Sequence, residues 1–148
     1  MFSTILVAVD GSNHSMKSVD VAAELTCQQP GIKLIVLSVY KHVSALENTH
    51  SMVRTRRPVE PPDAALKEWA EEIVEVAAKH ARERGVKDVQ TLVRRGPPAR
   101  TIVAVAKEVK ADAIVMGSRG LGDIGTVLMG SISHKVSNLA ECTCITVK

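Results

Sequence analysis

Short apolar runs alternate along this chain with longer segments in which apolar residues recur at every third or fourth position. The runs are rich in Val, Ile and Leu and occupy residues 4–9, 34–39, 89–93, 113–116 and 144–147. Because they are largely apolar and do not alternate strictly, they predict strands buried on both faces of a sheet. The segments between them predict four amphipathic helices, over residues 14–29, 63–84, 97–109 and 131–141.

The order of these elements predicts the fold class. Strands that alternate regularly with helices are typical of α/β domains, in which a parallel sheet is covered by helices on both faces. Right-handed crossovers leave two common doubly wound orders for five strands, 3-2-1-4-5 and 2-1-3-4-5. The 148 residues are the size of one domain, so we predict a single α/β domain over residues 1–148.

The composition restricts the kinds of partner and the cellular compartment that we expect for this protein. The aromatic residues are Phe2, Tyr40 and Trp69 alone and the formal net charge is +3, which gives little basis for binding RNA or DNA. No apolar run reaches the roughly 20 residues of a membrane span. The three cysteines form no CxxC pair, and no basic and apolar leader is evident. We therefore expect a cytoplasmic protein in a reducing compartment, without membrane insertion.

The richest candidate for chemistry is the segment 117–131, "GSRGLGDIGTVLMGS", which contains five glycines. Its Gly120, Gly122 and Gly125 match the dinucleotide fingerprint G-x-G-x-x-G. That fingerprint belongs after the first strand of a nucleotide-binding unit and opens a helix directly. Here the match follows the fourth predicted strand, and too little chain remains for a mononucleotide-binding half. We therefore interpret the match as accidental and disfavour an NAD site.

A phosphate cradle is the alternative interpretation of the same segment. Gly117 and Gly120 would let the backbone approach a ligand closely. Gly130 and Ser131 would open the last helix, whose first N–H groups attract phosphate, and the hydroxyls of Ser131 and Ser133 would add donors. A surface loop of small residues is the competing structural interpretation, and we favour the cradle.

The topology gives this cradle a neighbour. In the order 3-2-1-4-5 the ligand crevice lies beyond the carboxyl ends of strands 1 and 4. The first strand leads into Asp10, Gly11 and Ser12, and the fourth leads into Gly117. We therefore expect Asp10 to act on a ligand at this crevice, in preference to serving only as a cap of the first helix together with Ser12.

The spacing Gly117-x2-Gly120-x9-Gly130-Ser131 resembles the ATP-binding signature of the universal stress protein family. The segments "ILVAVDGS", "LIVLSVY" and "DAIVMGSRG" are similar to blocks of that family, and the resemblance covers nearly the whole chain. It implies the strand order 3-2-1-4-5, a homodimer, and a site for ATP, AMP or another adenine nucleotide with Mg²⁺.

The resemblance also implies a role for each matching residue. Asp10 would contact the ribose or a magnesium-bound phosphate. Ala8 and Val39 would flank the adenine, with Met116 on its other side. The ribose and the phosphates would be lined by Gly117, Arg119 and Gly120, and the phosphate tail would be held by Gly130, Ser131, Ile132 and Ser133.

These observations favour a nucleotide-binding regulatory protein of the stress response, which acts through nucleotide-dependent conformation or through partner binding. A slow ATPase is the enzymatic alternative, but the chain has no Walker lysine and no evident general base, so we assign no catalytic residue. A second alternative is a partner-binding module with a vestigial nucleotide site. Its partner would meet the predicted loop at residues 41–62, of which residues 42–62 resemble transporter-associated members of the family.

The last predicted strand, from Cys144 to Val147, has no segment after it to cover the sheet edge. Unpaired strand edges associate readily, and pairing between two copies of the same edge closes a symmetric dimer. We therefore expect a homodimer through this strand, in agreement with what the resemblance implies.

Other side chains carry structural expectations. One face of the helix over residues 63–84 is expected to pack on the sheet, with Trp69 as its anchor. Cys27 is expected to be a small buried residue, and Cys142 and Cys144 to be structural rather than a redox pair. The residues on the expected face of the helix are Leu66, Trp69, Ile73, Val76, Ala77 and His80.

Overall fold

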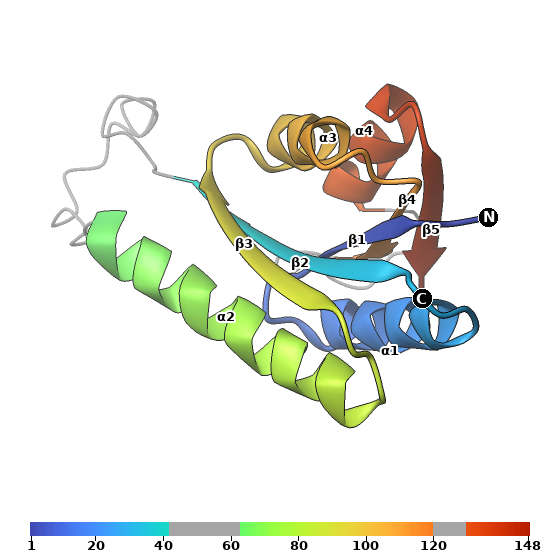
Figure 1. Cartoon of the computed structure of the whole chain (residues 1–148). Coiled ribbons are helices and arrows are strands. Elements are labelled where there is room, and N and C mark those ends of the chain that lie inside the picture. The colour runs from blue at the N-terminus through green and yellow to red at the C-terminus, as the bar shows by residue number, and fades with distance from the viewer. Residues whose placement is uncertain (42–62, 120–129) are drawn as a thin grey trace, which may run out of the picture.

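The computed structural model describes residues 1–41, 63–119 and 130–148, which form a five-stranded parallel sheet with helices on both faces (Figure 1). The predicted loop at 41–62, apart from Lys41, and the predicted site residue Gly120 lie outside the described residues. The strands are β1 Thr4–Ala8, β2 Lys33–Tyr40, β3 Val89–Arg95, β4 Ala113–Gly117 and β5 Thr143–Val147. The helices are α1 Asn13–Cys27, α2 Asp63–Glu83, α3 Pro98–Glu108 and α4 Ser131–Leu139.

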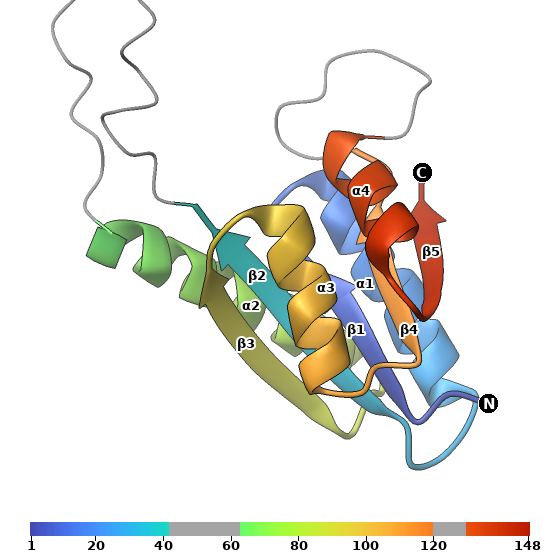
Figure 2. The same cartoon turned by 90° about the horizontal axis from the view of Figure 1, so that it is seen from above.

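The order along the sheet is β3-β2-β1-β4-β5, which confirms the predicted fold class and the first of the two strand orders. Figures 1 and 2 show α1 and α2 on one face of the sheet and α3 and α4 on the other. The inner strands β1, β2 and β4 contribute side chains to both core layers, because successive residues of a strand point to opposite faces. This explains why their sequences are apolar without alternation.

The turn from β1 into α1 is built by two residues with distinct tasks. Gly11 adopts φ +85°, a left-handed conformation that strains other residues. Ser12 is the N-cap of α1, and its Oγ accepts a hydrogen bond from the Ser15 N–H at 3.2 Å. The chain therefore reverses sharply at the end of β1, and the preceding residue, Asp10, is held at the carboxyl edge of the sheet.

The face of α2 that packs on the sheet is turned from the expected one, of which Ala77 is fully buried and Ile73 packs against the core. Trp69 is 52% exposed and Val76 is 61% exposed, so the prediction that Trp69 anchors this helix is wrong. Small side chains pack inward instead and let the helix lie close to β2 and β3. The sequence pattern favoured the other stripe because its larger residues carry a stronger apolar signal than alanine does. The buried residues of α2 are Ala70, Val74, Ala77, Ala78 and Ala81.

The prediction for Cys27 is also wrong, because this residue is exposed, with its Sγ 3.7 Å from the carbonyl oxygen of Arg84. Cys142 and Cys144 are half-buried and free. Burial raises the pKa of both of these thiols above its ordinary value. A thiol with a raised pKa holds little thiolate at neutral pH, which supports the structural interpretation of this pair.

One carboxylate joins α1 to α2. The Oδ1 of Asp20 lies 2.6 Å from Nε2 of His80 and 2.9 Å from Nη2 of Arg84. Both partners come from the last part of α2 or the residues just after it. The exposed part of the seam between the two helices is therefore bridged by a shared acceptor.

A second carboxylate fixes the start of β1. The Oδ2 of Asp112, the residue before β4, accepts hydrogen bonds from the backbone N–H groups of Ser3 at 2.7 Å and Thr4 at 2.9 Å. These two hydrogen bonds hold the pKa of the Asp112 carboxyl below its ordinary value of 3.8. The interaction ties the first strand to its neighbour at the amino end of the sheet.

We expect Asp112→Asn to remove a pH-dependent part of the stability. Because the pKa is lower in the folded chain than in the unfolded chain, the ionised form stabilises the fold above pH ~4, and this contribution is lost as the pH falls. The variant should be less stable at pH 7 by roughly 1 kcal/mol, with the difference shrinking toward about pH 3. Urea unfolding at a series of pH values measures this difference in the free energy of unfolding. Parallel pH profiles of the two proteins would contradict the assignment.

Candidate functional site

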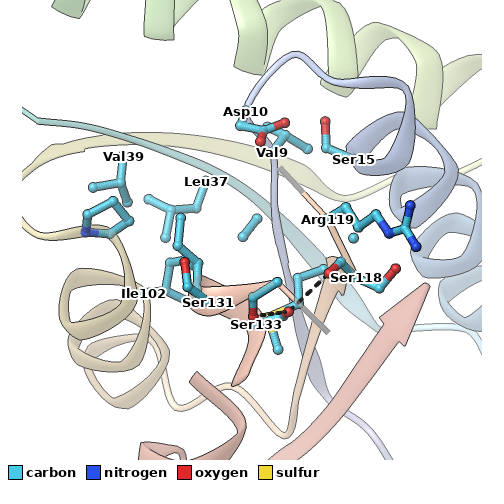
Figure 3. A pocket seen from close by; sticks show the side chains of 16 residues that line it. Val9, Asp10, Ser15, Leu37, Val39, Ile102, Ser118, Arg119, Ser131 and Ser133 are labelled. Carbon is cyan, nitrogen blue, oxygen red and sulfur yellow. Dashed lines mark hydrogen bonds between the residues drawn. The ribbon is translucent and has the colours of Figure 1, made fainter. Parts of the chain in front are cut away.

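A cavity of about 420 Å³ opens beyond the carboxyl ends of β1 and β4 (Figure 3). These strands are neighbours in the sheet, with Ala8 opposite Met116, although they are far apart in the sequence. The strand order reverses between them, and in doubly wound sheets ligands bind at this point. The lining residues are Ala8, Val9, Asp10, Ser15, Leu37, Val39, Pro98, Ile102, Met116, Gly117, Ser118, Arg119, Gly130, Ser131, Ile132 and Ser133.

The structure brings the predicted site residues together around this cavity. All of them line it except Gly120, which lies outside the described residues. They come from four separate places: the end of β1, the end of β2, the end of β4 with the residues after it, and the start of α4. Sequence distance hides this arrangement, and the parallel sheet creates it by placing all the carboxyl ends at one edge.

One part of the cavity wall is apolar. Figure 3 shows Val39, Leu37 and Ile102 together on one side of the cavity, with Ser118 and Arg119 on the other. Leu37 is fully buried, and Ile102 on α3 belongs to the same core layer. This part of the wall is therefore an extension of the core. It offers a flat or apolar ligand group a surface on which no polar group requires a hydrogen-bond partner.

Sequence reasoning missed six lining residues. Leu37 and Ile102 were interpreted as core residues, and Pro98 as a helix start. Both interpretations are correct, and neither indicates that the same side chains also face a cavity. A usable signal existed for Leu37, because it lies two positions before Val39 and points to the same face of β2. The other missed residues are Val9, Ser15 and Ser118.

The polar part of the wall is the start of α4. Gly130 is the N-cap of this helix and provides no side-chain hydrogen bond to it. The first backbone hydrogen bond of the helix runs from the N–H of His134 to the carbonyl oxygen of Gly130 at 3.0 Å. The N–H groups of Ser131, Ile132 and Ser133 precede it, so they have no partner within the helix. Together with the positive end of the helix dipole they favour an anion.

A chain of hydrogen bonds holds this helix start against the sheet. The Gly130 N–H donates to the Ser118 carbonyl oxygen at 2.6 Å, and the Ser118 N–H donates to the Val147 carbonyl oxygen at 2.7 Å. The buried Oγ of Ser133 donates to the carbonyl oxygens of Gly130 at 2.9 Å and Ser118 at 3.3 Å. The hydroxyl proton of Ser133 is thus engaged inward, contrary to the expected hydroxyl donor, and the Ser133 backbone N–H has no partner within the helix.

Asp10 stabilises the turn after β1 and also lines the cavity. Its Oδ1 accepts a hydrogen bond from the Ser12 N–H at 2.9 Å, which stabilises the turn after β1. The cap of α1 is Ser12, however, and the carboxylate of Asp10 lines the cavity. In Figure 3 it lies near Ser15. A carboxylate at this place can accept hydrogen bonds from hydroxyl groups or act on a hydrated cation.

Gly117 is required for packing as well as for the cavity. A Cβ atom on this residue would lie 3.0 Å from Cβ of His14, 3.1 Å from the backbone carbon of His14 and 3.2 Å from the carbonyl oxygen of Arg119. The missing side chain therefore lets the first turn of α1 approach the end of β4. Sequence reasoning had assigned the glycine to backbone approach by a ligand alone.

We expect Gly117→Ala to lower the free energy of unfolding by about 1–3 kcal/mol, since the methyl group meets backbone atoms that have little room to move. The same displacement should widen the crevice between α1 and β4 and weaken binding of any ligand there. Urea unfolding measures the change in the free energy of unfolding, provided that its dependence on urea concentration has the same slope as in the wild type. A change smaller than about 0.5 kcal/mol would show that α1 adjusts without cost.

Two kinds of site are not found in the described part of the chain. The side chains there include no cluster of three or more His, Cys, Asp or Glu that could hold a metal ion. None of the helices described is long and apolar enough to cross a membrane.

A sequence model of the universal stress protein family matches residues 1–148. The chain belongs to this family. It is 34% identical over 150 residues to the universal stress protein YxiE of Bacillus subtilis strain 168, and the alignment covers 100% of both chains. The resemblance seen in the glycine spacing and the strand blocks is thereby confirmed.

Solved universal stress proteins share the architecture. One in complex with cAMP is 26% identical with a TM-score of 0.69, covering 99% of this chain and 97% of that one. Another, from Archaeoglobus fulgidus and in complex with dAMP, is 25% identical with a TM-score of 0.68, covering 98% and 97%. These relatives bind adenine nucleotides on the fold described above.

Proposed function

We propose that the cavity binds an adenine nucleotide, with ATP and Mg²⁺ as the resident ligand, and that its occupancy regulates the conformation or the partner binding of this universal stress protein. The observation that carries the proposal is the combination, in one cavity, of an apolar wall with a helix N-terminus that has no side-chain cap. The apolar wall suits a nucleotide base, and the helix N-terminus suits a phosphate. The complexes of two family members with cAMP and dAMP support the same ligand class.

The described residues suggest how such a ligand would lie. The adenine would enter the apolar part, between Val39 and Met116 and close to Ala8. The ribose would then meet Asp10, and the phosphates would extend past Gly117 and Arg119 toward the start of α4. There Ser131, Ile132 and Ser133 offer backbone N–H groups, and Gly130, whose own N–H is bonded to Ser118, leaves room for the phosphates. The cavity volume of about 420 Å³ is in the range of small-ligand sites.

The donor set also fits a magnesium ion carried by the phosphates. Mg²⁺ in nucleotide sites is commonly held by one or two carboxylates together with phosphate oxygens and retained waters. Asp10 supplies a carboxylate in the wall, and an indirect contact through a water or a phosphate suits a single group of this kind. The ion would neutralise phosphate charge beside Asp10.

We further propose that the protein is a cytoplasmic homodimer joined through β5 and acts in the stress response. β5 pairs with β4 on one side and occupies the end of the sheet. The strand from Cys144 to Val147 is partly exposed, so its outer backbone groups can pair with the same strand of a second copy. Gel filtration with light scattering tests the dimer. The Thr143 N–H and the Val147 carbonyl oxygen bond toward β4, so the N–H of Thr146 points to the outer edge of the sheet. Thr146→Pro should therefore convert the dimer to a monomer, because proline removes that outer donor.

The first experiment identifies the ligand directly. The protein is purified without added nucleotide and denatured, and released small molecules are identified by chromatography and mass spectrometry. Calorimetric titration with ATP, AMP and cAMP, each with and without Mg²⁺, then ranks the ligands. We expect an adenine nucleotide to be released or ATP to bind at one site per chain, with tighter binding when Mg²⁺ is present.

A variant at the helix start assigns the binding to this cavity. Gly130→Val places a branched side chain at the buried N-cap of α4 and should abolish ATP binding, while circular dichroism shows an unchanged fold. A chain that releases no nucleotide and binds none in titration would overturn the proposal. So would ATP binding that the Gly130 substitution leaves unchanged.

A further inference from the structure

An apolar stripe runs along the flank of α2 that adjoins α1. It lies on the same side of the helix as His80, which bonds to Asp20 of α1, and its Ile73 packs against the core. It consists of Leu66, Trp69, Ile73 and Val76, which are spaced by three and four residues and so lie on one face of the helix. Trp69 and Val76 are more than half exposed, and the other two are half-buried. Figure 1 shows α2 packed on the sheet with no described element over its outer side. We call these four residues the α2 stripe.

Acidic residues border this stripe. α2 carries six acidic and three basic side chains, a formal charge of −3 with histidine neutral, in a chain whose net charge is +3. Glu72 follows Trp69 by three residues and precedes Val76 by four, so it is a surface neighbour of both. Glu68 lies one helical turn before Glu72. Both carboxylates are exposed, and neither forms an ion pair with a described residue.

Lys79 and Arg82 of α2 form no ion pair with a described residue and offset part of this charge, while the other basic residues nearby are already paired. On the side of α2 toward α1, His80 and Arg84 are both held by Asp20. On the opposite side Lys67 pairs with Glu71 at 3.9 Å. The apolar residues and the unpaired carboxylates thus occupy adjoining strips of the same helix, an arrangement complementary to a helix that has an apolar face flanked by positive charges.

We propose that the α2 stripe and the carboxylates of Glu68 and Glu72 form a docking surface for a cationic amphipathic helix of a protein partner. Leucine-like side chains of that helix would cover Trp69 and Val76, and its lysines or arginines would reach the two glutamates. The surface is separate from the cavity and from the β5 edge. It therefore gives the protein a partner site in addition to the proposed nucleotide site.

Other occupants fit the charge less well. A second copy of α2 would bring the same carboxylates against each other, and like charges at close range are repulsive. Anionic membrane surfaces and nucleic acids would be repelled by Glu68 and Glu72 for the same reason. A cationic helix satisfies the apolar and the electrostatic part of the surface together.

The single tryptophan of the chain provides a direct reporter, because it lies within the stripe. The probe is a peptide of about 18 residues composed of leucine at helical spacing and lysine, long enough to cover the length of the stripe. We expect it to shift the Trp69 emission to shorter wavelength and to reduce quenching by acrylamide. Binding should weaken as salt is raised, because exposed charges are screened.

Matched variants distinguish binding at this surface from nonspecific binding of the peptide. Val76→Asp and the double variant Glu68→Lys with Glu72→Lys should each weaken peptide binding about tenfold or more, while Trp69 remains as the reporter. Leu139→Asp, which changes an exposed leucine on α4 outside the stripe, should leave the affinity unchanged. A peptide of the same pattern with glutamate in place of lysine should not bind.

The proposal is overturned by any of several results. The first is equal binding of the lysine and glutamate peptides, or peptide binding that Val76→Asp and the double charge reversal do not weaken. The second is a concentration-dependent blue shift without peptide that accompanies self-association, which would assign the stripe to a second copy. The third is a shift caused by anionic phospholipid vesicles and not by the peptide, which would assign it to a membrane surface.

Discussion

Ser131→Asp is expected to weaken ATP binding about hundredfold while raising the thermal stability of the free protein. Ser131 is the first residue of α4 and lines the cavity, and the preceding Gly130 supplies no side-chain cap. A carboxylate in this first turn would interact with the exposed N–H groups and the positive end of the helix dipole, which stabilises the helix. The same charge would repel the phosphates for which those N–H groups are proposed. Calorimetry and thermal unfolding measure the two effects on one protein.

Two control variants isolate the charge from the site. Ser131→Ala removes the hydroxyl alone and should change the ATP affinity by less than about fivefold, the value of one hydrogen bond. Asn138→Asp places the same charge in the last turn of α4, where it opposes the helix dipole, and should lower stability slightly without changing ATP affinity. If Ser131→Asp binds ATP as tightly as the wild type, the phosphates do not lie at the start of α4.

Leu37→Ala is expected to lower the free energy of unfolding by about 2–5 kcal/mol. Leu37 is fully buried in the middle of the sheet, opposite Ala8 of β1 and Leu92 of β3. Truncation removes apolar contacts on the α3 side of the core, and the rigid strands cannot close the space. Because the same side chain lines the cavity, the apolar wall also recedes, and the ATP affinity should fall.

The control for this variant is Leu139→Ala on α4. Leu139 is 51% exposed, so its truncation should change stability by no more than about 0.5 kcal/mol. The free energies of unfolding of the two variants are compared by denaturant unfolding, with equal slopes of free energy against denaturant concentration. A loss below about 1 kcal/mol for Leu37→Ala would mean that neighbouring side chains refill the space, and the apolar wall would then be softer than the packing indicates.

Strand positions followed from the sequence because the physical signal is local and strong. Inner strands of a parallel sheet must be apolar on both faces, so residues 4–9 and 34–39 are continuous apolar runs, and the observed β1 and β2 agree with them within about two residues. Turn residues after these strands mark their ends. The glycine spacing from Gly117 to Gly130 also indicated the ligand edge, since few other structures need small residues at such intervals before a helix.

The orientation of α2 did not follow from the sequence. Two overlapping stripes of this helix are apolar, one of large residues around Trp69 and one of small residues around Ala78, and Ala77 belongs to both. A periodicity argument weighs side chains by size and therefore chose the first. The structure buries the second, because alanine lets a helix lie close to β2 and β3. The stabilisation comes from the close approach of the helix backbone to the sheet. It cannot be deduced from the type of any single residue.

The sequence alone determined the helices and strands, the parallel α/β class, the family, and most of the residues that meet at the cavity. These depend on residue type and on spacing along the chain, which a sequence states directly. The tertiary structure decided which side of α2 faces outward, that Leu37 and Ile102 serve both core and cavity, and that Gly117 is needed for the approach of α1. Each of these depends on distances between segments remote in sequence, and such distances are set when the whole sheet and its helices pack together.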